Sequence, residues 1–343
     1  MFRKTFILFL TFMSLEAQSP HRLLTQKATM DNVLFLNPAK LRLMQPDEKL
    51  TFNFITSSLS LSSDSLEFID ELNSASSSTS KNQEISKLLK KNIGETLSFS
   101  AHNFSSVDQN KDDLSWSLGM AHTLDGYFIT HTGFGSKGAM ESFMEKYRVL
   151  IATASLKKEN WDYGVNLKAM KKTRSSYNYS INEMIENDSL SDYFDNKNTQ
   201  EENALAVDMG IVYAPSTINF NPNFSFSLLN IGNSSFKELG TLAQTSNIGI
   251  SLTPYEELSL QIDYLDLFKN EDTQKFEDGF RVYLGKSFFN DNLTVSSGIV
   301  YNAWSFGLDY HYGIFKIGLH SYKVKEYNEK KQRRHELSLA VVW

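Results

Sequence analysis

The chain has 343 residues, no cysteine, 13% aromatic residues and a formal net charge of −6. The lack of cysteine excludes a disulfide scaffold and a lipoprotein anchor, and the negative charge gives no reason to expect a nucleic-acid partner. The sequence has no apolar run long enough to cross the inner membrane as a helix. The mean hydropathy of −0.34 is compatible with a membrane β-barrel, because only alternate residues of such a barrel face lipid.

The first residues predict a secretory signal peptide. Arg3 and Lys4 precede an apolar stretch over residues 6–13, and the small residue Ala17 stands just before Gln18. The stretch is shorter than the ~20 residues of a spanning helix. We therefore expect residues 1–17 to direct export and to be removed; a buried N-terminal helix is the alternative.

Residues 50–94 combine one strand pattern with two helical patterns. The alternating segment 50–62 is either the first strand of a barrel, which would make one later strand assignment wrong, or a segment inside the lumen. A Ser-rich stretch over 74–80 separates two groups of apolar residues at helical spacing, Leu66, Ile69 and Leu72, and then Ile85, Leu88 and Leu89. These groups predict short amphipathic helices that plug or flank the barrel, with a polar loop as the alternative.

Period-two segments recur over residues 95–343 and predict an all-β fold, an antiparallel transmembrane β-barrel of about 14 strands. The last segment, Arg334 to Trp343, alternates apolar and polar residues and ends on an aromatic residue, as expected for a closing strand. The predicted strands cover residues 95–105, 112–122, 125–136, 147–157, 160–171, 204–214, 222–231, 245–254, 258–266, 279–288, 292–301, 304–311, 314–325 and 334–343.

The connections between these segments predict which end of the barrel is external, since external loops are longer than periplasmic turns. Long connections fall on one side, at 137–146, 172–203, 232–244, 267–278 and 326–333. Short turn sequences fall on the other, at Asp125-Gly126, Glu159-Asn160, Tyr255–Glu257, Asn290-Asp291 and Gly313. The short external connection at Asn302-Ala303 is an exception.

Two external connections have a composition of their own. The connection 172–203 is rich in apolar and aromatic residues and predicts a lid or capture surface for an apolar ligand, formed by Tyr177, Tyr179, Ile181, Met184, Ile185, Tyr193 and Phe194. A basic run near the C-terminus faces either anionic sugars of the outer leaflet or water; it consists of Lys323, Lys325, Lys330, Lys331, Arg333 and Arg334.

No catalytic or metal-binding motif stands out. His102, His122 and His131 lack the short spacing of metal ligands. The acidic segment 108–113 lacks the glycine and the glutamate of a calcium loop, and no Gly-x-Ser-x-Gly elbow is present. The residues expected to face inward are polar: Ser115, Ser117, Gln261, Asp263, Asp309 and His311. We therefore expect no enzyme activity, no catalytic residue, no metal and no cofactor.

The run Asn37-Pro38-Ala39-Lys40-Leu41, just before the first strand pattern, resembles the N-terminal segment of the FadL-like superfamily of outer-membrane barrels. That superfamily includes long-chain fatty-acid transporters, PorV-type secretion proteins and conjugal-transfer TraF proteins. The resemblance implies a monomeric fourteen-stranded barrel in which residues 18–49 form a luminal plug, with Asn37, Pro38, Ala39 and Leu41 as its motif.

Two functions are compatible with the sequence. The first is a transporter or channel for hydrophobic small molecules, and the alternative is a structural or partner-binding barrel of a secretion or conjugal-transfer system. In either case we expect a bacterial outer-membrane location, contact with outer-membrane lipid and insertion by the barrel-assembly machinery. An apolar stripe on the inner face would favour the transporter.

Overall fold

The computed structural model describes residues 35–44, 50–76, 81–131, 140–180, 199–255, 257–268, 276–325 and 331–343. The predicted signal peptide and five of the seven predicted lid residues lie outside this part. Within it, no helix has the length and apolar character needed to cross a membrane. The short helices are η1 (Pro38–Lys40), α3 (Leu41–Met44), α4 (Ser63–Ser76), α5 (Lys81–Lys91), η3 (Lys237–Leu239) and α7 (Phe276–Gly279).

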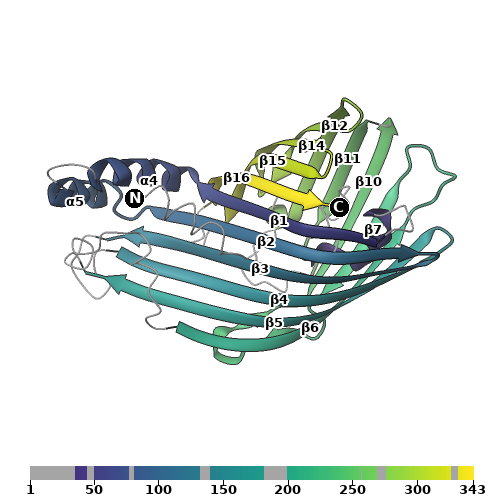
Figure 1. The fold of residues 1–343 in the computed structure, drawn as a ribbon, viewed down its shortest axis with the longest axis horizontal. Coiled ribbons are helices and arrows are strands. Elements are labelled where there is room, and N and C mark those ends of the chain that lie inside the picture. Colours follow the sequence, from purple (N-terminus) through teal and green to yellow (C-terminus); the bar gives the residue numbers. More distant parts are fainter. Residues whose placement is uncertain are drawn as a thin grey trace.

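Fourteen antiparallel strands close into one barrel (Figure 1), which confirms the predicted fold class. Two further short strands, β8 (Ser234–Ser235) and β9 (Thr241–Leu242), pair with each other outside the barrel sheet. The barrel strands are β1 (Leu50–Ser62), β2 (Thr96–Lys111), β3 (Leu114–Thr130), β4 (Met140–Lys158), β5 (Trp161–Tyr179), β6 (Thr199–Tyr213), β7 (Asn223–Leu229), β10 (Thr245–Tyr255), β11 (Leu258–Tyr264), β12 (Phe280–Phe288), β13 (Leu293–Val300), β14 (Ala303–Tyr312), β15 (Phe315–Lys325) and β16 (Lys331–Val342).

The predicted C-terminal strand closes the barrel against β1. The backbone N–H of Trp343 donates to the Phe52 carbonyl at 2.9 Å, and the Phe52 N–H donates to the Trp343 carbonyl at 2.7 Å. The Trp343 ring also stacks on Phe52 and Phe54. Each barrel strand therefore pairs with a neighbour on both sides and the sheet closes, although the external part of β6, residues 199–206, extends beyond its pairing with β7.

One predicted turn is wrong, and this resolves the strand count. Asp125 and Gly126 lie inside the long strand β3, which replaces the predicted strands 112–122 and 125–136. Gly126 occurs there because a Cβ atom at this position would lie 2.5 Å from the ring of Phe99 on β2. Segment 50–62 is therefore the first barrel strand, and the number of strands remains fourteen.

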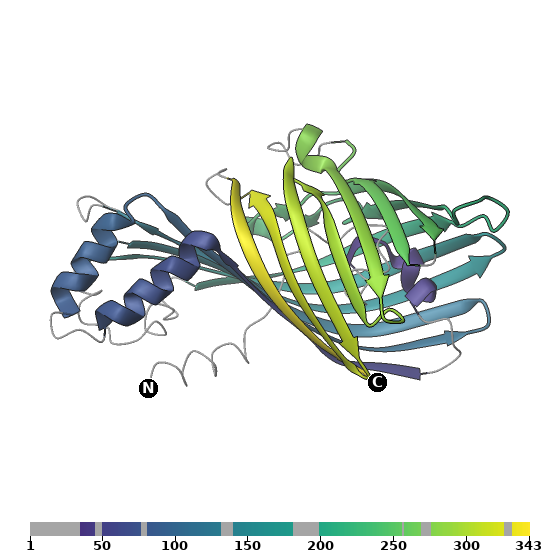
Figure 2. The same cartoon turned by 90° about the horizontal axis from the view of Figure 1, so that it is seen from above.

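The barrel is asymmetric along its axis. Strands β3 to β5 have 17 to 19 residues, whereas β7 and β11 have seven. The long strands project beyond the rest of the barrel at the end that carries α4 and α5 (Figure 2). This is the external end by the loop-length rule, because the connections 112–113, 159–160 and 313–314 at the opposite end are short.

Residues of opposite parity on the long strands face lipid and lumen. Leu118, Leu150 and Leu167 are exposed and lie on one face, while their neighbours Ser117, Ile151 and Asn166 are buried on the other. A membrane barrel needs this division, since its outer surface contacts acyl chains and its interior is packed or hydrated. The exposed apolar face places the barrel in the outer membrane.

The α4–α5 hairpin covers the outward face of the projecting strand ends. Phe68 of α4 and Leu88 of α5 pack with Leu97 and Phe128 on β2 and β3. Phe128 has the same parity on β3 as the exposed Leu118, so the hairpin covers a continuation of the lipid-facing surface. The helices therefore flank the barrel and shield apolar side chains that rise above the membrane.

Candidate functional site

The predicted plug motif folds as a turn of 3-10 helix that continues into α3. The Asn37 side-chain oxygen accepts a hydrogen bond from the Ala39 N–H at 3.0 Å and so caps the turn. Pro38 stands at the first helical position, where its fixed φ and missing N–H cost nothing. The other end of the Asn37 amide reaches the barrel, where Nδ2 donates to the carbonyls of Ile211 (3.4 Å) and Phe226 (3.3 Å).

Two glycines on neighbouring strands form the seat of this plug. Gly164 on β5 faces the backbone of Pro38 and Ala39, and Gly210 on β6 faces the Asn37 side chain. A Cβ atom on either glycine would overlap these atoms. Ser155 on β4 adds a hydrogen bond from its hydroxyl to the Ala39 carbonyl at 3.1 Å. At Gly164 backbone therefore packs directly on backbone, and at Gly210 the strand leaves room for the Asn37 side chain.

Arg42 ties the C-terminal part of the plug to the periplasmic turn between β2 and β3. Its guanidinium donates to the Asp112 carbonyl and lies 3.8 Å from the Asp113 carboxylate. The Arg42 carbonyl in turn accepts from the Asn110 side chain at 3.5 Å. The plug is thus held at two sites, the glycine seat and this turn.

Lys40 is the unusual residue of the plug, because its side chain is 4% exposed and its Nζ has no hydrogen-bond partner among the described residues. Burial lowers the pKa of Lys40 to about 7, and the nearby Asp263 on β11 opposes that shift. The plug therefore carries a cation whose charge depends on pH near neutrality.

We expect Asn37→Ala to weaken docking of the plug by about 1–3 kcal/mol, because the helix cap and two contacts to the barrel are lost together. Faster hydrogen exchange of a peptide covering residues 35–44, measured by mass spectrometry, would show the effect. Asn37→Asp keeps the cap acceptor but not the amide donor and should fall between wild type and alanine. Unchanged exchange in Asn37→Ala would show that the glycine seat alone holds the plug.

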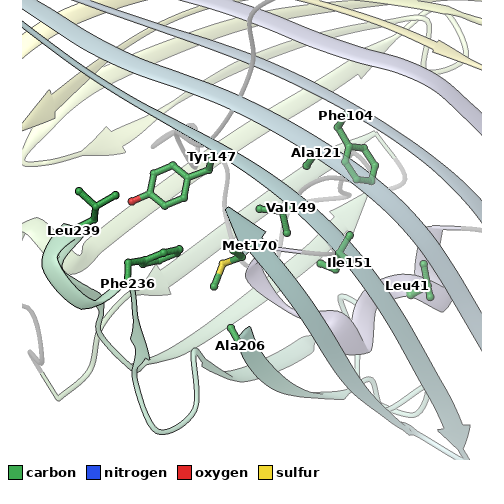
Figure 3. Packing of buried hydrophobic residues seen from close by; sticks show 10 residues of the cluster. All are labelled: Leu41, Phe104, Ala121, Tyr147, Val149, Ile151, Met170, Ala206, Phe236 and Leu239. Atoms are coloured by element: carbon green, nitrogen blue, oxygen red, sulfur yellow. The ribbon is translucent and has the colours of Figure 1, made fainter. Parts of the chain in front are cut away.

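Beyond the plug, the lumen contains a large apolar cluster (Figure 3). It is built mainly from inward positions of β2 to β6, with Leu41 of the plug at one end and the β7–β10 connection at the other. Its buried members are Leu41, Phe104, Ala121, Tyr147, Val149, Ile151, Met170, Ala206, Phe236 and Leu239. Phe236 and Leu239 belong to a connection that folds inward around β8, η3 and β9.

Buried charges flank this apolar cluster on both sides. Lys168 lies two residues before Met170 on β5, on the periplasmic side of the cluster. Its Nζ lies 2.9 Å from the Asp208 carboxylate and donates to the Asn230 side chain at 2.9 Å. Above the cluster, Glu145 binds Lys172 at 3.0 Å and accepts from Nε of Arg174 at 2.7 Å. Each of these cations lies beside a carboxylate, Lys168 beside Asp208 and both Lys172 and Arg174 beside Glu145, so the apolar surface lies between two polar layers that contain ion pairs.

Two solved structures with a similar architecture are toluene transporters. The toluene transporter TbuX of Ralstonia pickettii matches at a TM-score of 0.57 and 10% identity, over 90% of this chain and 92% of that one. The toluene transporter TodX of Pseudomonas putida matches at 0.55 and 10% identity, over 96% and 98%. A FadL homologue of Pseudomonas aeruginosa matches at 0.49. The chain therefore shares the barrel fold of the two toluene transporters.

The similarity lies in structure and not in sequence. No protein-family model matches the chain, and no curated protein matches it in sequence. At about one residue in ten identical, the comparison establishes a shared fold over nearly the whole of both chains. It does not transfer a ligand-binding residue, so the site rests on the geometry described above.

The structure places the predicted site residues in different parts of the barrel. Asn37, Pro38, Ala39 and Leu41 lie together in the lumen. Tyr177 and Tyr179 belong to β5 and not to a loop, and they pack with Met140 and Leu89 beneath the α4–α5 hairpin. The other predicted lid residues, Ile181, Met184, Ile185, Tyr193 and Phe194, lie outside the described part.

The positions predicted to be polar and inward do face inward. Ser115, Ser117, Gln261 and Asp263 are buried, and Asp309 and His311 lie on the same face of β14 as the buried Ser305 and are partly exposed. His102 faces the lumen and His122 the outside, so the two do not converge. In the described residues no group of three or more histidine or acidic side chains could hold a metal ion. The sequence did not indicate the apolar inward cluster or the glycine seat.

Proposed function

We propose that this protein is an outer-membrane channel for hydrophobic small molecules. The observation that carries the proposal is the apolar cluster on the inner face, because a water-filled porin would have no need for ten buried apolar side chains in its lumen. Binding pockets for apolar ligands are lined by such residues with a few placed polar groups. The two similar solved structures of toluene transporters support the same class of ligand.

The arrangement suggests the order of events along the path. A ligand enters from the external end beside Phe236 and Leu239, crosses the apolar surface of β4 and β5 around Val149 and Met170, and meets Leu41 of the plug. The plug blocks the lumen through its seat on Gly164 and Gly210. Release then requires the plug to move or a passage to open beside it.

Introducing a charge into the apolar cluster tests the proposal. We expect Met170→Glu to reduce uptake of radiolabelled toluene or of a long-chain fatty acid into cells or proteoliposomes by about tenfold or more, because a polar carboxylate then replaces an apolar side chain in the middle of the cluster. Ser225→Asp is the matched control, since it adds the same charge on the inner face of β7, away from the cluster. The gel-mobility shift on heating should confirm that both variants form closed barrels.

Equal uptake by wild type and Met170→Glu would reject the channel and favour the partner-binding alternative. We also propose that the protein contacts outer-membrane lipid, is inserted by the barrel-assembly machinery and is a monomer. The closed sheet supports the monomer, because every barrel strand already pairs with a strand of the same chain on each side.

A further inference from the structure

A group of basic side chains lies on the outward face of β3 to β5, one step beyond the apolar band. His122, Arg148 and Lys171 are directly opposite one another on the three strands, and Lys146 follows Arg148 on the same face of β4. The next outward residues in the periplasmic direction, Met120, Leu150 and Ala169, are exposed and apolar. We call these four residues, His122, Lys146, Arg148 and Lys171, the outer basic cluster.

The outer basic cluster destabilises the barrel when no anion is bound to it. Like charges directly opposite on neighbouring strands destabilise a sheet, and Arg148 and Lys171 are such a pair. The carboxylate nearby is Glu201 on β6, which binds Lys171 at 2.5 Å. Within the described part of the chain, neither Lys146 nor Arg148 forms an ion pair. Three basic side chains therefore share one carboxylate on this outward face.

The position of the cluster corresponds to the headgroups of the outer leaflet. Arg148 and Lys158 are ten residues apart on β4, which at ~3.3 Å per residue and a tilt of ~40° is about 25 Å across the membrane, the height of the apolar band of such barrels. The other end of this band carries Trp161 and Tyr213, whose rings lie 4.4 Å apart. Aromatic residues of this kind occupy the membrane interface.

A second pair on β15 and β16 provides a contrast. Lys323 and Arg333 are also directly opposite on the outward face. There, however, the guanidinium donates to the Ser321 hydroxyl at 3.0 Å and to the Trp304 carbonyl at 2.9 Å. The protein itself satisfies that arginine, whereas the Arg148 guanidinium remains available to an external acceptor.

We propose that the outer basic cluster binds the phosphate groups of an anionic glycolipid in the outer leaflet. Arginine recognises phosphate through two parallel hydrogen bonds, and lysine adds a point charge. A phosphate between Arg148 and Lys171 turns their repulsion into two attractions, and Lys146 is placed for a second phosphate or a carboxylated sugar. The bound glycolipid packs its acyl chains along the apolar face below, at Leu150 and Leu167.

Native mass spectrometry of the detergent-solubilised protein with added bisphosphorylated lipid A tests the proposal. We expect wild type to retain one glycolipid, and Arg148→Gln/Lys171→Gln to bind it about tenfold or more weakly. Lys323→Gln/Arg333→Gln removes the same charge at the same membrane level and should bind like wild type. The mobility shift on heating checks that each variant is folded.

Three outcomes would overturn the proposal. Equal binding by wild type and Arg148→Gln/Lys171→Gln would leave the cluster as a hydrated membrane anchor. Equal binding of dephosphorylated lipid A would remove the phosphate from the interaction. Displacement of the glycolipid by inorganic phosphate at the same concentration would assign the site to a free anion instead of a lipid.

Discussion

Replacing Gly164 with valine is expected to expel the plug and convert the barrel into an open pore. The new Cβ would overlap the Ala39 nitrogen and the Pro38 carbonyl carbon and lie 2.6 Å from the Ala39 Cα. These are backbone atoms of a turn fixed by Pro38 and by the Asn37 cap, so they cannot rotate away as a side chain would. The undocked plug also loses the hydrogen bonds from Ser155 and Asn37.

Ion conductance of the purified protein in a planar bilayer measures this change. Wild type should show rare openings, and Gly164→Val should show a pore that is open most of the time. Deletion of residues 35–44 should give the same pore, and adding Gly164→Val to the deletion should change nothing further, because both remove the same obstruction. A closed Gly164→Val barrel would mean that another part of the chain blocks the lumen.

The barrel could be predicted from the sequence because its outer face must be apolar at every second residue. The alternation in β11 and β14 is regular enough to give strand positions within a few residues. The failure at Asp125 and Gly126 has a physical cause. This pair is typical of a turn. In β3, however, the glycine allows the Phe99 ring to lie close to the backbone, and the strand continues above the membrane.

The functional site could be predicted only in part. The plug motif is contiguous, so the sequence displays it. Its seat depends on two glycines more than 120 residues away, and nothing local distinguishes them from other glycines of a barrel. The apolar cluster could not be predicted for a different reason. In β4 the successive residues Val149, Leu150 and Ile151 are all apolar, so the sequence there does not alternate between apolar outward and polar inward residues. A continuous apolar run within an otherwise alternating strand is the signal that could have located it.

Docking of the plug is expected to depend on pH through Lys40. The pKa of this buried amine is about 7 when the plug is docked and ~10.4 when it is in water. Between these values the undocked plug binds more protons, so docking weakens as the pH falls from about 10.5 to 7 and stays constant below that. Each pKa unit corresponds to ~1.4 kcal/mol, so the total change is a few kcal/mol.

Conductance recorded from pH 7 to pH 10 should therefore fall as the pH rises, with the plug most firmly seated at the alkaline end. Lys40→Met keeps the length of the side chain without its charge, and we expect this variant to be closed at every pH in the range. Asp263→Asn removes the carboxylate that favours the charged amine, so it should open the wild-type plug further at neutral pH. A conductance that does not change with pH in wild type, or that changes equally in Lys40→Met, would show that Lys40 does not control docking.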